Sequence, residues 1–262
     1  MKENHSVESQ IEQFAKLIHM SKKIVVFTGA GVSTESGIPD FRSPDGIWTR
    51  FDPEDFTYQK FISSKEARKK MYGLFSESGL MADASPNNTH IAIAKLEEMG
   101  KLDCVITQNV DGLHQKAGNS DDKVFELHGN LVWVICLSCD KRYPIGDIIE
   151  RVKQGEDDPG CEECRGILKP DAVFFGEALP QTELNNATDC SANCELFIVI
   201  GSSLVVYPAA YMPTYAVNAG AKLVLINKEP THMDRAAHIR IFASAGDTMK
   251  KVMEKVKEKS IK

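Results

Sequence analysis

Short runs of aliphatic and aromatic residues recur along this chain, and they limit its possible folds more than any other feature. Most are rich in Val, Ile, Leu and Phe and lead directly into glycine or polar residues, as buried parallel strands do. The runs that we expect to be strands are Ile24–Gly29, Cys104–Thr107, Val124–Leu127, Leu196–Ile200 and Leu223–Ile226.

Helical patterns lie between several of these strands. The stretch Val7–Met20 has apolar residues at helical spacing, with Ser6 as its expected N-cap. Further helices are expected at His90–Met99, Gln181–Asn193, Ala209–Asn218 and Asp247–Lys259. Strands that alternate with helices predict an α/β domain with a mostly parallel sheet.

Two stretches interrupt this alternation. Residues 44–85 carry aromatic and charged side chains at helical spacing, which predicts a helical insertion. Residues 131–169 contain two CxxC pairs around a polar centre, formed by Cys136, Cys139, Cys161 and Cys164. Four thiolates at this spacing satisfy tetrahedral Zn²⁺ and leave no position for water, so we predict one structural zinc. The alternative is four unconnected buried or redox cysteines.

Composition and charge exclude several classes of protein. The chain of 262 residues has 31 basic and 37 acidic side chains, and this net charge of −6 argues against a protein that mainly grips nucleic-acid phosphates. No run is apolar for long enough to span a membrane, and the N-terminus lacks the apolar centre of a secretory signal. Seven cysteines without such a signal indicate a reducing compartment. We therefore expect a cytoplasmic protein without membrane or direct nucleic-acid partners.

A glycine-rich segment follows the first strand directly. Gly29 and Gly31 allow a tight turn and the close approach of backbone N–H groups to a phosphate. A dehydrogenase fingerprint would have a third small residue in place of Thr34, and an acidic residue where this chain has a loop. The spacing alone leaves two interpretations open, a dinucleotide site or a turn without a ligand.

Polar side chains gather where the other predicted strands end. Gln108, Asn109 and Asp111 follow the second strand and offer partners for ribose hydroxyls and an amide, and His128 follows the third. The later strands lead into three residues that suit contacts with ribose or adenine, Ser202, Ser203 and Asn227. Because open α/β sheets bind ligands beyond the carboxyl ends of their strands, these residues predict a ligand site.

Seven features in a fixed order carry a resemblance to a known family. They are GAGVSTESGIPDFR, TQNVDGLH, ELHGN, the four cysteines, FFGE, GSSLVVYP and LVLIN, spread between Ile24 and Gly246. Together they resemble the sirtuins, the NAD-dependent protein deacylases, and are similar to bacterial and archaeal members without long terminal extensions. The resemblance implies a Rossmann-type parallel sheet with helices on both faces, plus a small helical and zinc-binding domain.

The same resemblance implies how the chain is divided. The whole of residues 1–262 would form one catalytic unit. Its large domain would be built from residues 1–43, 86–130 and 170–262, with the helical insertion at 44–85 and the zinc module at 131–169.

The resemblance also implies a reaction. The acyl oxygen of a modified lysine would attack C1′ of the nicotinamide ribose as nicotinamide leaves, and the acyl group would end on ADP-ribose. His128, with an unperturbed pKa of about 6.5, would be the general base for a ribose hydroxyl. Two alternatives stay open, mono-ADP-ribosyl transfer to protein from the same NAD site and a zinc-ribbon binding module without catalysis.

The matched motifs imply which residues contact each substrate. NAD would be bound by Gly29, Ala30, Gly31, Thr34, Ile38, Asp40, Phe41, Arg42, Gln108, Asn109, Val110, Asp111, Ser202, Ser203, Asn227 and Ala245. The acyl-lysine protein or peptide would add as a strand between Val173, Phe174, Phe175, Gly176 and Glu177 on one side and Leu204, Val205, Val206 and Tyr207 on the other. Val173 and Phe175 would line the acyl tunnel.

The choice of acyl group depends on the helical insertion. Desuccinylating sirtuins have a Tyr-x-x-Arg pair there, whereas this chain has Tyr72 followed by Phe75 in the place of the arginine. Arg68, one helical turn before Tyr72, is the other candidate for binding an acyl carboxylate. We expect neutral acyl groups to be preferred, acetyl first.

Overall fold

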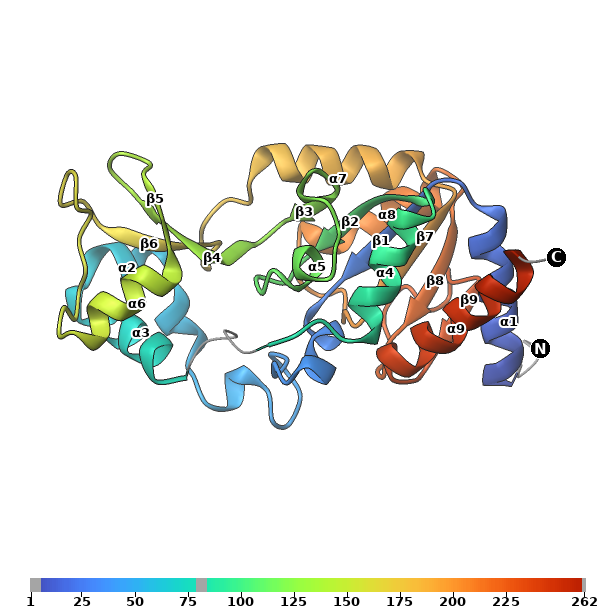
Figure 1. The fold of residues 1–262 in the computed structure, drawn as a ribbon, viewed down its shortest axis with the longest axis horizontal. Helices are drawn as coiled ribbons and strands as arrows, with labels where there is room; N and C mark the ends of the chain where they lie inside the picture. The colour runs from blue at the N-terminus through green and yellow to red at the C-terminus, as the bar shows by residue number, and fades with distance from the viewer. Residues whose placement is uncertain (1–5, 79–83, 261–262) are drawn as a thin grey trace.

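Six parallel strands form the central sheet of the protein, whose computed structural model describes residues 6–78 and 84–260. The strands are β1 (Ile24–Thr28), β2 (Leu102–Thr107), β3 (Val124–Glu126), β7 (Leu196–Ile200), β8 (Lys222–Ile226) and β9 (Ile239–Ile241). They lie side by side in the order β3-β2-β1-β7-β8-β9 (Figure 1). With the strands of a second sheet set aside, this is the 3-2-1-4-5-6 order of doubly wound folds. The order reverses between β1 and β7, the place where such folds bind ligands.

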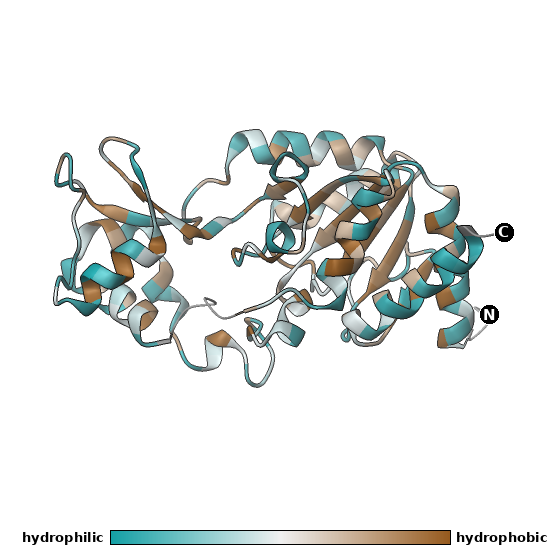
Figure 2. Ribbon diagram, in the orientation of Figure 1, coloured by the Kyte–Doolittle hydropathy of each residue, from teal (hydrophilic) through white to brown (hydrophobic). Residues whose placement is uncertain are grey.

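Helices cover both faces of this sheet because its strands send side chains alternately into two apolar cores. The helices on one face are α1 (Val7–Met20), α4 (Asn88–Glu98) and α9 (Ala245–Ser260), and those on the other are α7 (Gln181–Asn193) and α8 (Met212–Asn218). Val26 of β1 belongs to the first core, whereas its neighbours Val25 and Phe27 belong to the second. Figure 2 shows hydrophobic strands between helices that are largely hydrophilic on their outer sides. The predicted Rossmann-type architecture is confirmed.

An antiparallel sheet and a group of helices form the other end of the molecule (Figure 1). The sheet has the order β5-β4-β6, from strands β4 (Gly129–Cys136), β5 (Arg142–Pro144) and β6 (Leu168–Ala172). The helices are α6 (Ile145–Lys153), α2 (Tyr58–Ser63) and α3 (Lys65–Ser78). Phe61 and Tyr72 from the helical insertion share a third core with Val134, Leu168 and Phe174. The two segments that interrupt the strand–helix alternation therefore fold against each other.

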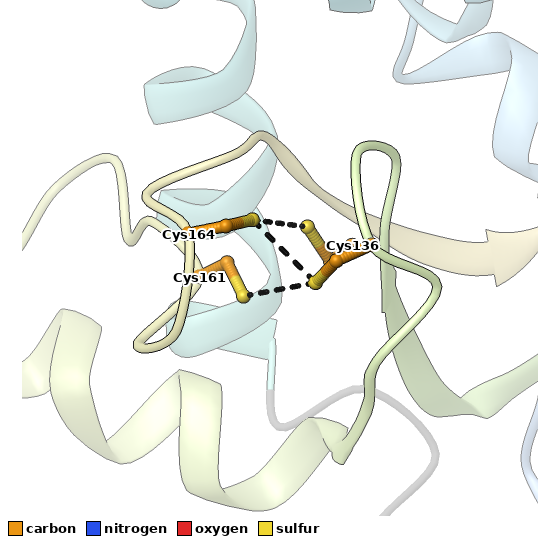
Figure 3. Close-up of side chains that lie close together, drawn as sticks. Cys136, Cys161 and Cys164 are labelled. Atoms are coloured by element: carbon orange, nitrogen blue, oxygen red, sulfur yellow. Dashed lines mark hydrogen bonds between the residues drawn. The ribbon is translucent and has the colours of Figure 1, made fainter.

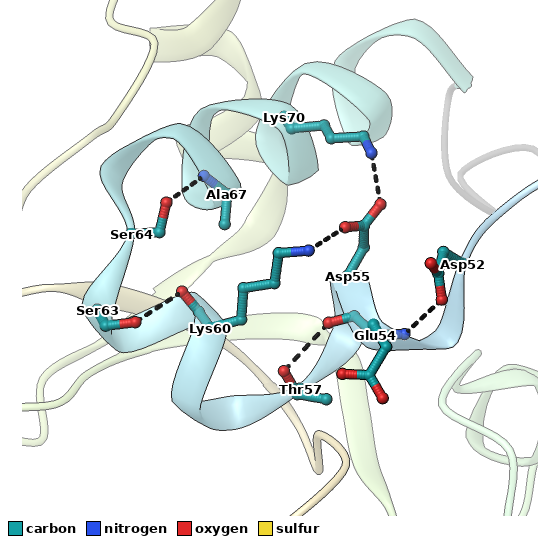
Figure 4. Close-up of polar contacts among 9 residues, drawn as sticks. All are labelled: Asp52, Glu54, Asp55, Thr57, Lys60, Ser63, Ser64, Ala67 and Lys70. Atoms are coloured by element: carbon teal, nitrogen blue, oxygen red, sulfur yellow. Dashed lines mark hydrogen bonds and ion pairs between the residues drawn. The ribbon is translucent and has the colours of Figure 1, made fainter.

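The carboxylate of Asp55 links a 3₁₀ turn of the insertion to the helices α2 and α3 (Figure 4). Asp55, in the 3₁₀ turn Pro53–Phe56, accepts hydrogen bonds from Lys60 at 2.6 Å and from Lys70. Both lysines favour the ionised carboxylate, so the pKa of Asp55 lies below its usual value. Because both ammonium groups are largely exposed, this network adds little to stability, and the third core holds the insertion in place.

Most elements begin and end close to their predicted bounds. The Ser6 side chain caps α1 as expected, and α4 begins two residues before the predicted His90 because Asn87 caps it. The predicted helix Ala209–Asn218 divides into a 3₁₀ turn and α8, whose first turn contains Pro213, a residue suited to a helix start. Residues 1–5, 79–83 and 261–262, which the predicted catalytic unit and its insertion include, lie outside the described residues. In the described ranges no helix is long and apolar enough to cross a membrane.

Candidate functional site

Four thiols meet at the outer end of the antiparallel sheet (Figure 3). The Sγ atoms of Cys136, Cys139, Cys161 and Cys164 all lie within 4.8 Å of one another. The Sγ–Sγ distance is 3.4 Å for Cys136 and Cys164 and 3.7 Å for Cys139 and Cys161. Tetrahedral zinc with Zn–S bonds of about 2.3 Å has S···S edges of about 3.8 Å, so the four sulfurs fit one Zn²⁺. All four coordination positions would be filled by protein, as a structural ion requires.

Glycines bring the loop after β1 against the end of β7. Gly29 N donates to Ile200 O at 3.2 Å, and Gly31 N donates to Gly201 O at 2.9 Å. A Cβ on Gly31 would lie 2.8 Å from the Gly201 backbone, and Gly201 has a φ of +63°, which favours glycine. The hydroxyl of Thr34 donates to Gly31 O at 3.0 Å and so supports the turn. The loop therefore has a defined shape at the point where the strand order reverses.

A buried polar triad, formed by Ser33, Asn109 and Asp111, connects this loop to the segment after β2. Ser33 Oγ donates to Asp111 Oδ2 at 2.6 Å, and Asn109 Nδ2 donates to Ser33 Oγ at 3.1 Å. All three side chains are buried. The structure thus brings Asn109 and Asp111 together as predicted and adds Ser33, which the sequence reasoning missed. Its position inside the glycine-rich segment was the available signal.

His128 follows β3 and has one ring nitrogen engaged. Its Nδ1 lies 3.1 Å from the carbonyl oxygen of Gln108. Because a carbonyl can only accept, Nδ1 carries the proton and the neutral ring keeps its lone pair on Nε2. Burial lowers the pKa of His128 below its usual value, and the bond to Gln108 opposes this. The Gln108 side chain in turn accepts a hydrogen bond from Ser202 Oγ at 2.8 Å, which joins the ends of β2 and β7.

The predicted substrate segment 173–177 begins beside His128. Val173 N donates to His128 O at 2.8 Å. Phe174 is buried in the third core, whereas Phe175 is 49% exposed and its ring centroid lies 5.8 Å from that of Trp48. Glu177 turns back within the segment and accepts from Phe174 N at 2.8 Å, around Gly176 with its positive φ. The segment is therefore a tight turn with an aromatic side chain on its surface.

A buried lysine holds this turn. Lys169 is 4% exposed, and its Nζ donates to Pro170 O at 2.9 Å and to Ala172 O at 2.6 Å. The same Nζ lies 3.2 Å from the Glu177 carboxylate and 4.5 Å from the ring centroid of Phe174. Burial lowers the pKa of Lys169 in spite of Glu177. No sequence pattern indicates this role, because it depends on how the turn folds back onto β6.

The second predicted substrate segment, residues 204–207, follows the end of β7. Leu204 is buried with a φ of +56°, and its N–H donates to Ser202 Oγ at 3.2 Å. Val205 and Tyr207 are each 52% exposed, and Val206 is half-buried. Exposed apolar side chains that follow a sheet edge in this way suit contact with a partner chain.

Both side chains considered for carboxylate binding are engaged elsewhere. Arg68 forms a two-point contact with Asp158, at 2.8 Å and 3.0 Å, and its third nitrogen donates to Phe61 O at 3.1 Å. Tyr72 is fully buried, its hydroxyl donates to Leu168 O at 2.9 Å, and burial raises its pKa. Phe75 is buried in the same core. Neither Arg68 nor Tyr72 offers a group to a negatively charged acyl chain.

The loop of residues 38–42 connects, in sequence, Ser33 of the triad with the insertion. Ile38 is buried, and Asp40 accepts the backbone N–H groups of Arg42 and Ser43. The ring of Phe41 lies 5.2 Å from that of Trp48. The Arg42 side chain is exposed.

The other predicted NAD residues lie in the glycine-rich loop and after the strands β2, β7, β8 and β9, and they are not part of the triad. Ser203 is exposed, Ala245 is buried at the start of α9, and Asn227 donates to Glu229 O at 2.8 Å. Ala30 is half-buried in the glycine-rich loop, and Val110 is half-buried beside the third core. Glu35, which the sequence reasoning did not select, accepts from Gly246 N at 2.9 Å and so ties this loop to α9.

Comparisons with known proteins place this site in a known context. A profile of the Sir2 family matches residues 29–208, more than half of the chain. The chain is 47% identical over 253 residues to an NAD-dependent protein deacetylase of Thermodesulfovibrio yellowstonii, covering 96% of this chain and 97% of that protein. It is 44% identical to NAD-dependent protein deacylase 2 of Archaeoglobus fulgidus, covering 96% and 98%. A solved structure of Sir2 with a p53 peptide and NAD+ has a TM-score of 0.86 at 40% identity, covering 96% of this chain and 99% of that one.

Proposed function

The chain belongs to the Sir2 family, and we propose that it removes acyl groups, acetyl first, from lysine side chains of proteins with NAD as co-substrate. The acyl group passes to ADP-ribose and nicotinamide is released, and one water molecule is consumed as the lysine amine is freed. The observation that carries this proposal at the level of residues is the state of His128. It is a neutral imidazole with a lone pair on Nε2, bonded to the carbonyl of Gln108 just before the triad residue Asn109, and its own backbone carbonyl accepts from Val173 of the proposed substrate segment.

The triad and the glycine-rich loop are suited to NAD, which supplies the ribose carbon and hydroxyl for the reaction. Asn109 and Asp111 offer amide and carboxylate groups to nicotinamide and ribose, and Ser33 fixes their orientation. Phe41 covers the sugar, and the exposed Arg42 pairs with the pyrophosphate. The adenosine end lies along Ser202, Ser203, Asn227 and Ala245.

His128 acts as the base. Its Nε2 takes the proton from a ribose hydroxyl, and its Nδ1–H remains bonded to Gln108 O throughout. That carbonyl stabilises the imidazolium which forms, because a fixed acceptor favours the charged ring. Since burial lowers the pKa of His128, the ring is neutral at physiological pH and ready to accept a proton.

The acyl-lysine segment of the substrate lies between residues 173–177 and 204–207. Its backbone adds as a strand, and the acyl chain enters between Val173 and Phe175. Because Arg68 and Tyr72 are committed to Asp158 and Leu168, a buried acyl carboxylate would have no partner there. Neutral acyl groups are therefore preferred.

We also propose a cytoplasmic location and the division of the chain stated above. Four of the seven cysteines form a cluster that suits zinc, the use that paired cysteines have in a reducing compartment. The third core supports a separate small domain, because residues 44–85 and 131–169 supply most of it. Ala172 and Phe174 also contribute to that core, so the chain returns to the large domain just after them.

The proposal is tested by incubating the protein with NAD and an acetyl-lysine peptide, with the same peptide carrying unmodified lysine as the matched control. We expect nicotinamide release and loss of the acetyl group only with the acetylated peptide. Nicotinamide release accompanied by a peptide that gains ADP-ribose would instead establish ADP-ribosyl transfer. A protein that leaves both NAD and peptide unchanged would contradict the proposal.

A further inference from the structure

A second set of buried polar side chains is contiguous with the Ser33–Asn109–Asp111 triad. His114, on the short helix α5 (Leu113–Lys116), is 2% exposed, and its Nε2 lies 3.0 Å from Thr28 Oγ1. Thr28 Oγ1 is bonded to Thr107 Oγ1 at 2.8 Å. Thr107 Oγ1 accepts the backbone N–H of Asn109 at 3.0 Å. These contacts join the ends of β1 and β2 to the residues proposed to bind nicotinamide and ribose.

A second histidine lies beside His114, and its tautomer follows from its contacts. His90 Nδ1 accepts the backbone N–H of Asn87 at 3.3 Å, within the N-terminal cap of α4. Burial lowers the pKa of His90 to about 4, so the ring is neutral and its proton is on Nε2. Asp111, the acidic group that acts on this ring, only partly opposes the effect of burial. The Nε2–H group of His90 has no hydrogen-bond partner among the described residues.

The unpartnered atoms of the two rings are complementary. His114 Nδ1 is buried and also lacks a partner among the described residues, and the two ring centroids are 5.0 Å apart. With its proton on Nε2, His114 donates to Thr28, and its Nδ1 lone pair is available to the His90 Nε2–H group. The opposite tautomer would leave both rings presenting an N–H group, and a buried donor without an acceptor is unfavourable.

We propose that His114 is a positioning residue for the reaction, held in its Nε2-protonated tautomer by the Nε2–H group of His90 through one buried water that bridges the two unpartnered atoms. His114 fixes Thr28 and Thr107, and Thr107 fixes the backbone of Asn109. The circuit closes because Asp111 Oδ1 accepts from Leu113 N at 2.9 Å, at the start of the helix that carries His114. The link to catalysis rests on the proposed function, whereas the tautomers do not.

The tautomers are tested on the unmodified protein by ¹⁵N NMR of the histidine rings at pH 7. We expect both His90 and His114 to be neutral and protonated on Nε2. A charged ring, or a His114 protonated on Nδ1, would overturn the assignment. This measurement does not depend on enzymatic activity, so it remains decisive even if the protein proves not to be a deacylase.

The positioning role is tested by kinetics of His114→Phe, which removes the donor and keeps a ring, and of His114→Gln, whose amide can still donate to Thr28. We expect the first variant to lower kcat/KM for NAD on the order of 10–100-fold, since small displacements of binding groups have effects of this size. The second should regain part of that loss. His238→Gln is the control, because His238 lies just before β9 at the opposite end of the parallel strands, where it accepts the backbone N–H of Leu223.

Thr28→Val supplies an independent check if His114→Phe does not fold. It removes the hydroxyl that His114 contacts while keeping the shape of the side chain, and it should reproduce the loss in kcat/KM for NAD. Normal NAD kinetics in a folded His114→Phe or Thr28→Val protein would overturn the positioning role. So would equal impairment of His114→Phe and His114→Gln, since a purely structural histidine would not be rescued by a donor.

Discussion

His128 can act as a base because its two ring nitrogens have different environments. Nδ1 is committed to the carbonyl of Gln108, which leaves the lone pair of the neutral ring on Nε2. The bond comes from the backbone of Gln108, directly after β2, so the ring orientation does not depend on another flexible side chain. The residue is therefore fixed in the protonation state that proton abstraction needs.

Replacing His128 with alanine should lower kcat by roughly 10²–10⁴, the range for a general base. The melting temperature should change little, because the ring is only half-buried at the sheet edge. The acid limb of the wild-type pH profile should lie below the usual histidine value of about 6.5, since burial lowers the pKa. A folded variant with near-normal single-turnover deacetylation would remove His128 from the mechanism.

Acetyl-lysine should be turned over with a higher kcat/KM than succinyl-lysine in the same peptide. The physical reason is that Arg68 is held by Asp158 and the Tyr72 hydroxyl by Leu168 O, so a succinyl carboxylate would be buried without a partner. Paired kinetic assays of the two peptides make the comparison. Faster turnover of the succinyl peptide would show that another cation serves the acyl chain.

Sequence patterns predict those residues of the site that follow a recognisable strand in the chain. Asn109, Asp111 and His128 lie directly after predicted strands, and that position alone brings them to one edge of the sheet. Ser33 and His114 were not predicted as site residues, because their partners Asp111 and Thr28 are distant from them in sequence. Their importance depends on which strand lies beside which, and a residue pattern does not state that.

At the scale of elements, the buried ammonium group of Lys169 stabilises the turn that follows β6. The ammonium group of Lys169 binds the carbonyls of Pro170 and Ala172 in β6 and the Glu177 carboxylate of the turn, so it ties the turn to the end of the strand. The proposed substrate segment 173–177 is thereby held although Phe175 on its outer surface stays exposed.

Lys169→Met should raise KM for the peptide with a smaller effect on kcat, because it loosens the substrate turn and leaves Glu177 unpaired. It should also lower the free energy of unfolding by up to about 3–5 kcal/mol, the effect of breaking a buried ion pair. Lys255→Met is the control, since its pair with Glu258 is exposed and should be worth less than about 1 kcal/mol. Equal effects of the two substitutions in urea unfolding and peptide kinetics would contradict this role.

The zinc module should contain close to one equivalent of Zn²⁺ by metal analysis. Cys161→Ser should lose the ion and destabilise the third core, because Cys136 and Cys161 are both part of that core. Cys190→Ser serves as the control, since Cys190 lies on α7 outside the cluster. Full zinc content together with an unchanged melting temperature in Cys161→Ser would rule out a structural tetrathiolate site.

Helices and strands were predictable where one hydrophobic pattern extends along the whole segment. The strands β1 and β7 are buried throughout, and β2 and β8 are buried at all but one residue each. The apolar runs of these four strands match the observed bounds within two residues. The strand β9 was missed because it has three residues and an exposed Arg240 at its centre. The antiparallel sheet was missed because β4 pairs irregularly with β6, so no regular alternation marks it.

For the whole molecule, two cores enclose the parallel sheet and a third core joins the two inserted segments. Several of the proposed contacts, among them Arg42, His128 and Val173, lie close to the points where the chain passes between these parts. The fold class followed from the alternation of strands and helices. The strand order did not, because β7 lies beside β1 although the whole antiparallel sheet separates them in sequence.

Stability of the whole protein should fall as the pH is lowered from 6.5 to 5. Burial lowers the pKa of His90 to about 4 and that of His114 to about 3, so over this range the unfolded state binds protons that the native state excludes. Each histidine can contribute a slope of up to about 1.4 kcal/mol per pH unit. Urea unfolding at several pH values measures it, and His90→Gln should flatten the dependence. A stability independent of pH over this range would show that the histidines are not held neutral.

The central claim is that the acyl group of lysine is transferred to ADP-ribose at this site. The most direct measurement uses a peptide whose acetyl group carries deuterium, incubated with NAD and followed by mass spectrometry of every product. The claim predicts equal amounts of nicotinamide, deacetylated peptide and ADP-ribose that bears the labelled acetyl group. Label released as free acetate while NAD stays intact, or ADP-ribose attached to a peptide that keeps its label, would contradict it.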